Sequence, residues 1–178
     1  MDESHLITRI QQGDTESFRY LYRLHSLSAW QLAISICKHK TNAEEAVQNS
    51  FINAFQYITH FRRESSFKTW LLRIVFNESI RIQKAEKKFQ WQEIPDSEEE
   101  HEPIQISGSN PLQQKETKEQ VSRVISKLSE REAVVLNLFY LEELSIKESA
   151  AILGYTEGNV KVLLHRARKN FKYEYEKL

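Results

Sequence analysis

Apolar residues recur every three or four positions along most of this chain, which is the spacing of one buried face of an α-helix. The repeat predicts a helix at Ser4–Gln12, a second helix that begins at Asp14, and a third that ends near Lys38–Lys40. It also predicts a helix at Ala43–Ile58, capped by Asn42, and one from Phe67 to about Phe89. Further along it predicts helices at Gln113–Leu128, at Glu130–Leu141, and on both sides of a turn within Ser145–Phe171. With only four glycines and three prolines in 178 residues, helices are favoured over strands, and we predict an all-α fold.

The repeat also assigns a buried face to each helix. The helix after Asp14 is expected to bury Phe18, Leu21, Tyr22 and Leu24, and a separate helix to carry Trp30, Ile34, Ile36 and Cys37. The helix after Asn42 is expected to bury Val47, Phe51, Ala54, Phe55 and Ile58.

The periodic pattern stops between Trp91 and Leu112, where prolines, a glycine and the acidic run DSEEE replace it. Such residues interrupt helices and supply no apolar face to bury. We therefore predict two small helical domains, at residues 1–90 and 113–178, joined by a flexible acidic linker at residues 91–112.

The net charge of zero hides an uneven distribution along the chain. Residues 1–90 carry a net +4, residues 91–119 a net −6, and residues 120–178 a net +2. Two basic ends flank an acidic middle, so the summed charge understates the affinity of the ends for nucleic acid.

The segment Ser145–Lys169 has the pattern of a helix-turn-helix. Ser145 and Glu148 form an S-x-x-E capping box, Gly154 suits the end of the first helix, and Thr156 can cap the second. The polar side of the second helix carries Asn159, Lys161, His165, Arg166 and Lys169. This pattern is typical of a helix that enters a DNA major groove; the alternative is an ordinary helical hairpin with a solvated basic face.

A second basic stretch, from Tyr57 to Gln90, carries eight lysines and arginines against three acidic residues, with aromatic residues between them. Cations that follow phosphates beside rings that stack on bases are the chemistry of single-strand binding. Phe61 lies in the polar stretch Thr59–Ser66 and is the best candidate for contacting a base, whereas we expect Trp70 and Phe76 to be packed.

Composition excludes several other functions. A single cysteine, Cys37, rules out a disulfide framework, and the six histidines lack metal-ligand spacing. There is no phosphate-binding glycine loop and no nucleophile elbow, so we expect no catalytic residue, no metal and no cofactor. No apolar segment is long enough to span a membrane and the N-terminus is not a signal peptide, so a cytoplasmic protein is expected.

Three blocks of the sequence, in this order, resemble an extracytoplasmic-function (ECF) sigma factor of bacterial RNA polymerase. NAEEAVQNSFINAF (Asn42–Phe55) is similar to the segment with which that family docks on core polymerase. FRRESSFKTWLLRIVFN (Phe61–Asn77) resembles its promoter −10 segment, and Leu128–Lys169 resembles its −35-binding domain. The resemblance implies a non-catalytic specificity subunit whose partners are core RNA polymerase, promoter DNA and an anti-sigma factor, commonly membrane-anchored.

The resemblance also implies roles for particular residues. Contact with core polymerase falls on Glu44, Glu45, Gln48 and Asn49. Capture of a melted −10 base and contact with its strand fall on Phe61, Arg62, Arg63, Ser65, Ser66, Phe67, Lys68, Trp70, Arg73, Asn77 and Arg81. Contact with the −35 duplex falls on Asn159, Lys161, Val162, His165, Arg166 and Lys169.

The sequence departs from the family at a few of these positions. It has Val162-Leu163 where members often have a Ser-Arg pair, which removes a polar contact expected at the groove. It also has Asn42 and Asn49 where an acidic residue is common.

Two other classes of function remain as alternatives. A conventional helix-turn-helix regulator would bind duplex DNA without polymerase, as a dimer on paired half-sites. It needs no single-strand segment, so the block Phe61–Asn77 disfavours it. An enzyme is disfavoured by the lack of a catalytic motif.

Overall fold

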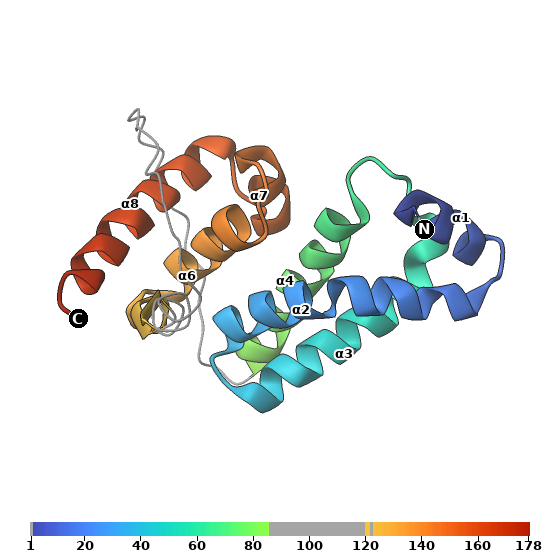
Figure 1. Cartoon of the computed structure of the whole chain (residues 1–178), viewed down its shortest axis with the longest axis horizontal. Coiled ribbons are helices and arrows are strands. Elements are labelled where there is room, and N and C mark those ends of the chain that lie inside the picture. Colours follow the sequence, from blue (N-terminus) through green and yellow to red (C-terminus); the bar gives the residue numbers. More distant parts are fainter. Residues whose placement is uncertain (1, 86–119, 122) are drawn as a thin grey trace, which may run out of the picture. The chain divides into compact units, whose positions relative to one another are not determined.

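The computed structural model describes residues 2–85, 120–121 and 123–178, and these form two compact units (Figure 1). Within those ranges every regular element is a helix and no strand occurs, so the prediction of an all-α fold with two helical units is confirmed. The predicted linker at residues 91–112 and the first part of the helix predicted at Gln113–Leu128 lie outside the described residues.

The N-terminal unit is built on three helices, α2 (Phe18–Cys37), α3 (Lys40–Tyr57) and α4 (Phe67–Ala85), which pack against one another (Figure 1). Helix α1 (Glu3–Gln11) precedes them, and the 3-10 turns η1 (Thr15–Ser17) and η2 (Ile58–His60) lie before α2 and after α3. The fully buried side chains of this bundle include Leu21, Ala29, Leu32, Ala33, Ile36, Ala43, Ala46, Ala54, Leu71, Leu72 and Val75.

Helix α2 is longer than the sequence suggests. The prediction of two helices between Asp14 and Lys40 is wrong, because α2 runs unbroken for 20 residues. It begins after η1, where the Asp14 carboxylate accepts a hydrogen bond from the Ser17 backbone N–H at 3.2 Å. It ends at Cys37, and the C-cap residue Lys38 has a left-handed φ of 59°. No glycine or proline separates these ends, so the two apolar stretches join in one helix.

Helix α3 begins at Lys40, and His39 rather than Asn42 is its N-cap residue, so the predicted Asn42 cap is wrong. Three side chains expected in the core are exposed: Tyr22 by 48%, Leu24 by 61% and Phe55 by 40%. The outer faces of α2 and α3 thus keep an aromatic surface, where the rings of Phe18 and Phe55 lie 5.1 Å apart.

The C-terminal unit contains α6 (Glu130–Leu136), the π-helical turn η3 (Asn137–Leu141), α7 (Ile146–Leu153) and α8 (Glu157–Tyr175). Residues 120–121 and 123–127 are also helical, which agrees with the described part of the helix predicted there. Helix α6 packs on α8. The fully buried side chains here include Val124, Ala133, Val134, Val135, Leu138, Val160 and Ala167.

Candidate nucleic-acid interfaces

The first candidate interface is the loop Phe61–Ser66 together with the start of α4. Its polar members Arg62, Arg63, Ser65 and Ser66 are exposed and Lys68 is half-buried. The Ser66 hydroxyl accepts a hydrogen bond from the Thr69 backbone N–H at 3.0 Å, which fixes the first turn of α4. Four of the polar residues predicted for the −10 segment, Arg62, Arg63, Ser65 and Ser66, therefore lie together on one exposed loop.

The aromatic members of this segment form a cluster. The rings of Phe61 and Trp70 lie 5.0 Å apart, and Phe67 lies 5.9 Å from Phe61 and 5.6 Å from Trp70. Phe61 is 6% exposed and Phe67 is 1% exposed, whereas Trp70 is only half-buried. The prediction that Phe61 is the ring available to a base is therefore wrong, because its ring packs on two others despite its polar neighbours. Among these three rings, Trp70 is the one that reaches the surface.

Helix α4 carries the remaining residues predicted for the −10 segment. Arg73, Asn77 and Arg81 are exposed and lie about one turn apart, so they share one face. The Arg81 guanidinium donates to one carboxylate oxygen of Glu78 through Nε at 2.9 Å and Nη2 at 2.8 Å. Its charge is thus partly neutralised.

The second candidate interface is the helix-turn-helix. The predicted capping box is present, because Ser145 and Glu148 each accept from the other's backbone N–H. Gly154 ends α7 with a left-handed φ of 72°, and the Thr156 hydroxyl accepts from the Asn159 N–H at 3.1 Å to open α8. The capping box, the glycine and the threonine cap predicted for this turn are therefore all confirmed.

The outward face of α8 carries the residues predicted for −35 contact. Lys161, Arg166 and Lys169 are exposed, and Asn159, Val162 and His165 are half-buried. Leu163 is 1% exposed and lies in the core of the unit. At this position the chain therefore presents no side chain to the outward face of α8.

A buried carboxylate, Glu132 of the S-x-x-E capping box that the sequence predicts at Ser129, ties this face to α6. Glu132 is 4% exposed and accepts from Arg166 Nε at 3.0 Å and from Asn170 Nδ2 at 2.7 Å. It also accepts from the Ser129 N–H and hydroxyl in the second capping box. Burial alone would raise the pKa of Glu132, but the hydrogen bonds from Ser129 and Asn170 and the charge of Arg166 outweigh it and hold this pKa below its ordinary value. Only the S-x-x-E spacing of Ser129 and Glu132 is visible in the sequence.

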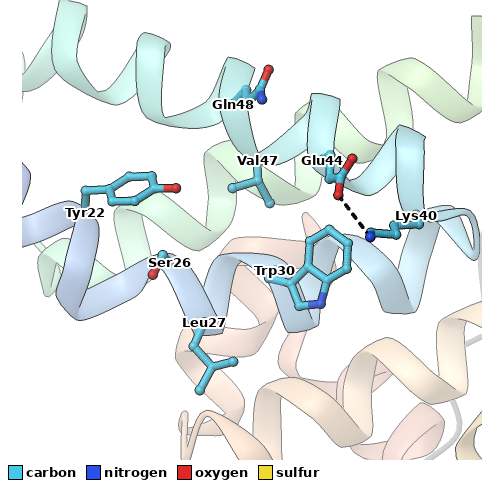
Figure 2. Close-up of a pocket in the computed structure, with 8 residues that line it drawn as sticks. All are labelled: Tyr22, Ser26, Leu27, Trp30, Lys40, Glu44, Val47 and Gln48. Carbon is cyan, nitrogen blue, oxygen red and sulfur yellow. Dashed lines mark ion pairs between the residues drawn. The ribbon is translucent and has the colours of Figure 1, made fainter.

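The residues predicted to dock on polymerase lie on α3, where Glu44, Glu45 and Gln48 are exposed and Asn49 is half-buried. Beside them, between α2 and α3, lies a groove of about 430 Å³ (Figure 2). It is lined by Tyr22, Ser26, Leu27, Trp30, Lys40, Glu44, Val47 and Gln48. Lys40 Nζ lies 3.7 Å from Glu44 Oε1 at its polar end. The sequence did not reveal this groove, because its pattern assigned Tyr22 and Trp30 to the core.

Two further observations concern only the described parts of the chain. No helix there combines the length and the apolar character needed to cross a membrane. No group of three or more histidine, cysteine, aspartate or glutamate side chains there is placed to hold a metal ion.

Comparison with known families assigns each unit a class. Residues 21–89 match the model of Sigma-70 region 2, and residues 118–171 match the model of Sigma-70, region 4. The fold and its two exposed polar surfaces thus define a sigma factor, a transcription initiation factor of bacterial RNA polymerase. The presence of both regions on one chain favours this class over a regulator that binds duplex DNA alone.

Individual relatives narrow the class. The chain is 30% identical to the ECF RNA polymerase sigma factor SigM of Bacillus subtilis over 158 residues, which span 88% of this chain and 94% of SigM. It is 31% identical to the ECF RNA polymerase sigma-E factor of Salmonella typhimurium over 180 aligned residues, which span 92% of this chain and 89% of that one. This chain therefore belongs to the ECF group of RNA polymerase sigma factors.

Solved structures share its fold. CnrH, solved in complex with the cytosolic domain of CnrY, matches with a TM-score of 0.65 and 20% identity over 97% of this chain and 96% of that chain. RpoE of Bartonella quintana, solved with the anti-sigma factor NepR, matches with a TM-score of 0.64 and 23% identity over 90% of this chain and 98% of that chain.

Proposed function

We propose that this sigma factor binds core RNA polymerase through its N-terminal unit and reads a promoter with both units. The observation that carries the proposal is the presence of regions 2 and 4 on one chain, each with its predicted polar residues on an exposed face. Residues 1–90 form the polymerase-docking and −10 domain, residues 113–178 form the −35 domain, and residues 91–112 link them. The chemistry of RNA synthesis belongs to the polymerase, so the sigma factor contributes no catalytic residue and no cofactor.

At the −10 element the loop Phe61–Ser66 and the adjoining face of α4 hold the melted strand. Unstacking and extruding a base costs a few kcal/mol, which a pocket for the base and stacking on an aromatic ring can recover. Trp70, the half-buried ring at the edge of the aromatic cluster, stacks on this base. Arg62 and Arg73 supply exposed charges for the neighbouring phosphates.

At the −35 element α8 lies in the major groove. Lys161 and Lys169 are exposed and suited to phosphates, which set register without reading sequence. Arg166 is the candidate for a base edge, because Glu132 holds its Nε and thereby orients the outer nitrogens of the guanidinium. The departure at Val162-Leu163 leaves base reading to Arg166 and its polar neighbours.

Docking on polymerase uses the α3 face and the groove beside it. Glu44 and Glu45 attract a basic partner, and Leu27, which is 65% exposed, offers apolar area for burial. A polar rim around an apolar centre is the usual anatomy of a protein interface.

The protein acts in the cytoplasm under the control of an anti-sigma factor, of the membrane-anchored kind common in this family. The supporting observation is that RpoE of Bartonella quintana, which shares this fold, was solved with the anti-sigma factor NepR. Affinity capture from cells under non-inducing conditions tests this part, and recovery of the protein with no such partner would contradict it.

Run-off transcription tests the function as a whole. Purified core polymerase is supplied with a library of random promoters, with and without this protein. We expect initiation at a defined subset of promoters only when the protein is present, which would also give the −10 and −35 sequences. Tight binding of duplex DNA by the protein alone, without any stimulation of polymerase, would instead establish a conventional regulator.

A further inference from the structure

Helix α1 makes a set of contacts with the −10 loop that the docking and DNA surfaces described above do not include. The family match begins at residue 21, so α1 (Glu3–Gln11) lies outside it. Yet α1 contacts the turn η2, and its last residue, Gln11, reaches the backbone just before and at the start of the loop.

The Gln11 side-chain amide binds the loop with both of its ends. Its Nε2 donates to the Ile58 carbonyl at 2.9 Å and to the Phe61 carbonyl at 3.2 Å. Its Oε1 accepts from Arg63 Nη2 at 3.4 Å. Two carbonyls on one side and a guanidinium on the other suit an amide, which has donors at one end and an acceptor at the other.

Arg63 completes the connection from the other side of the loop. Its Nη2 also donates to the Thr8 hydroxyl at 2.6 Å, and that hydroxyl donates to the Ser4 carbonyl at 2.9 Å. The backbone of Arg63 is left-handed, with a φ of 60°, a conformation that is unfavourable for a non-glycine residue and persists only where its surroundings hold it. The hydrogen bonds of its side chain to Thr8 and Gln11 are part of those surroundings.

Helix α1 is itself anchored, so it can serve as a fixed support. Leu6, Ile7 and Ile10 are at most 4% exposed. The Glu3 carboxylate lies 3.1 Å from Nε2 of the buried His25 on α2, and the ring of His25 lies 5.4 Å from that of Phe67. Helix α1 therefore contacts the loop through Gln11 and Thr8. Through Glu3 it also contacts His25, whose ring lies beside Phe67.

We propose that Gln11 is a positioning residue for −10 recognition, which holds the loop Phe61–Ser66 in the conformation that receives a melted base. The inference rests on the proposed function, because it assigns the loop to base capture. Gln11 does not itself contact DNA; it acts by fixing the carbonyls of Ile58 and Phe61 and the side chain of Arg63.

Three variants separate this role from others. Gln11→Ala removes every contact, and Gln11→Glu keeps the size of the side chain while placing an acceptor against the two carbonyls. Gln12→Ala is the matched control, because Gln12 is the adjacent exposed glutamine at the end of the same helix. The Gln11 side chain makes three hydrogen bonds to Ile58, Phe61 and Arg63. We expect their loss to change the measured rates roughly tenfold, which corresponds to about 1.4 kcal/mol.

The first experiment measures open-complex formation by the full chain with core polymerase, on a promoter obtained from the run-off selection. We expect Gln11→Ala and Gln11→Glu to slow melting of the duplex promoter roughly tenfold, with Gln12→Ala unchanged. Binding of a −35 duplex should stay at the wild-type level. A template with a preformed bubble should reduce the deficit, since melting no longer has to be driven; a variant that is only misfolded would be equally defective on both templates.

The second experiment needs no promoter. Trypsin cuts after Arg62 and Arg63, and its rate at a native loop follows how often that loop opens. In the free full-length protein we expect Gln11→Ala and Gln11→Glu to raise cleavage at these two sites about tenfold relative to cleavage at Lys172, while Gln12→Ala leaves the ratio unchanged. Unchanged cleavage in both Gln11 variants would overturn the claim that Gln11 holds the loop.

The outcomes distinguish the inference from the function it rests on. If the wild-type protein initiates transcription and both Gln11 variants melt the promoter normally, the inference alone is overturned. If the wild-type protein fails to initiate, the proposed function fails and the base-capture role of Gln11 fails with it. Slow melting together with fast cleavage in both Gln11 variants supports the two together.

Discussion

Replacing Glu132 with glutamine tests how the recognition helix α8 is held to its domain. The carboxylate accepts four hydrogen bonds: from the Ser129 N–H at 3.1 Å, the Ser129 hydroxyl at 2.7 Å, Arg166 Nε at 3.0 Å and Asn170 Nδ2 at 2.7 Å. An amide has one acceptor atom where the carboxylate has two, so one end of the glutamine must present a donor to other donors.

The loss of stability in Glu132→Gln depends on which end of the glutamine amide faces Ser129. Turning the NH₂ toward Ser129 is cheaper, because the Ser129 hydroxyl can rotate to accept while only its N–H loses a partner. The bond from Arg166 then goes to a neutral acceptor. A neutral hydrogen bond is worth about 0.5–1.5 kcal/mol and one to a charged group about 1.5–3 kcal/mol. We therefore expect a loss of about 2 kcal/mol in the stability of the C-terminal unit.

The same unit supplies its own control. Glu148 sits in a second S-x-x-E capping box and accepts from the Ser145 N–H at 3.0 Å and hydroxyl at 2.7 Å, but it is half-buried, whereas Glu132 is 4% exposed. Glu148→Gln makes the same local change, and we expect it to cost about 0.5 kcal/mol.

Hydrogen exchange followed by mass spectrometry measures the exchange rates of the α8 amides in both full-length variants. About 2 kcal/mol corresponds to roughly 30-fold faster exchange of the most protected α8 amides in Glu132→Gln, and about 0.5 kcal/mol to roughly twofold in Glu148→Gln. Equal acceleration in the two variants would refute the reasoning, because it would show that the bonds from Arg166 and Asn170 add nothing to the cap.

The dependence on pH follows from the same carboxylate. Although burial acts to raise the pKa of Glu132, its hydrogen bonds and Arg166 lower this pKa below its ordinary value of 4.5. A group whose pKa is lower in the folded state contributes its full stability above the unfolded pKa and loses it as the pH falls through the folded pKa. Protection of α8 in the wild-type protein should therefore decline more steeply below about pH 4.5 than in Glu132→Gln.

Four other substitutions test the proposed surfaces. Arg166→Ala should weaken binding of a −35 duplex by about 1–3 kcal/mol if it pairs a guanine, as measured by fluorescence anisotropy, and unchanged affinity would remove it from the interface. Trp70→Ala should slow open-complex formation, with a loss of about 1–3 kcal/mol from one stacked base, and leave −35 binding intact; normal melting would assign the base to another residue. Phe61→Ala should lower the stability of the N-terminal unit by about 3–5 kcal/mol in thermal unfolding, because the ring is 6% exposed. Leu27→Asp should weaken binding to core polymerase at least roughly tenfold, whereas Leu24→Asp, on the same helix but not in the lining of the groove, should not.

Features that depend on a few neighbouring residues could be predicted from the sequence. The capping boxes at Ser129 and Ser145, the left-handed Gly154 and the Thr156 cap are all present in the structure. Each is set by hydrogen bonds between residues at most five positions apart, so a short stretch of sequence contains all the information needed. The helix-turn-helix was predictable for the same reason.

Features that depend on distant residues could not be predicted. Phe61 was expected to be exposed because its neighbours in the chain are polar, yet its burial is decided by Phe67 and Trp70. The contacts of Gln11 with Ile58 and Phe61 join residues 47 and 50 positions apart. Helical periodicity places a residue on a face, but it does not say which other helix covers that face.

The unbroken length of α2 fixes the angular relation between two surfaces of the N-terminal unit. His25 points toward α1 and Phe67, while Ser26, Leu27 and Trp30 line the groove. A helix turns about 100° per residue, so one residue inserted after His25 would rotate the groove lining out of phase with the base-capture end. The same insertion would turn Leu32, Ala33 and Ile36, all at 0% exposure, away from the core. Homologues should therefore keep the number of residues between the two ends of this helix unchanged.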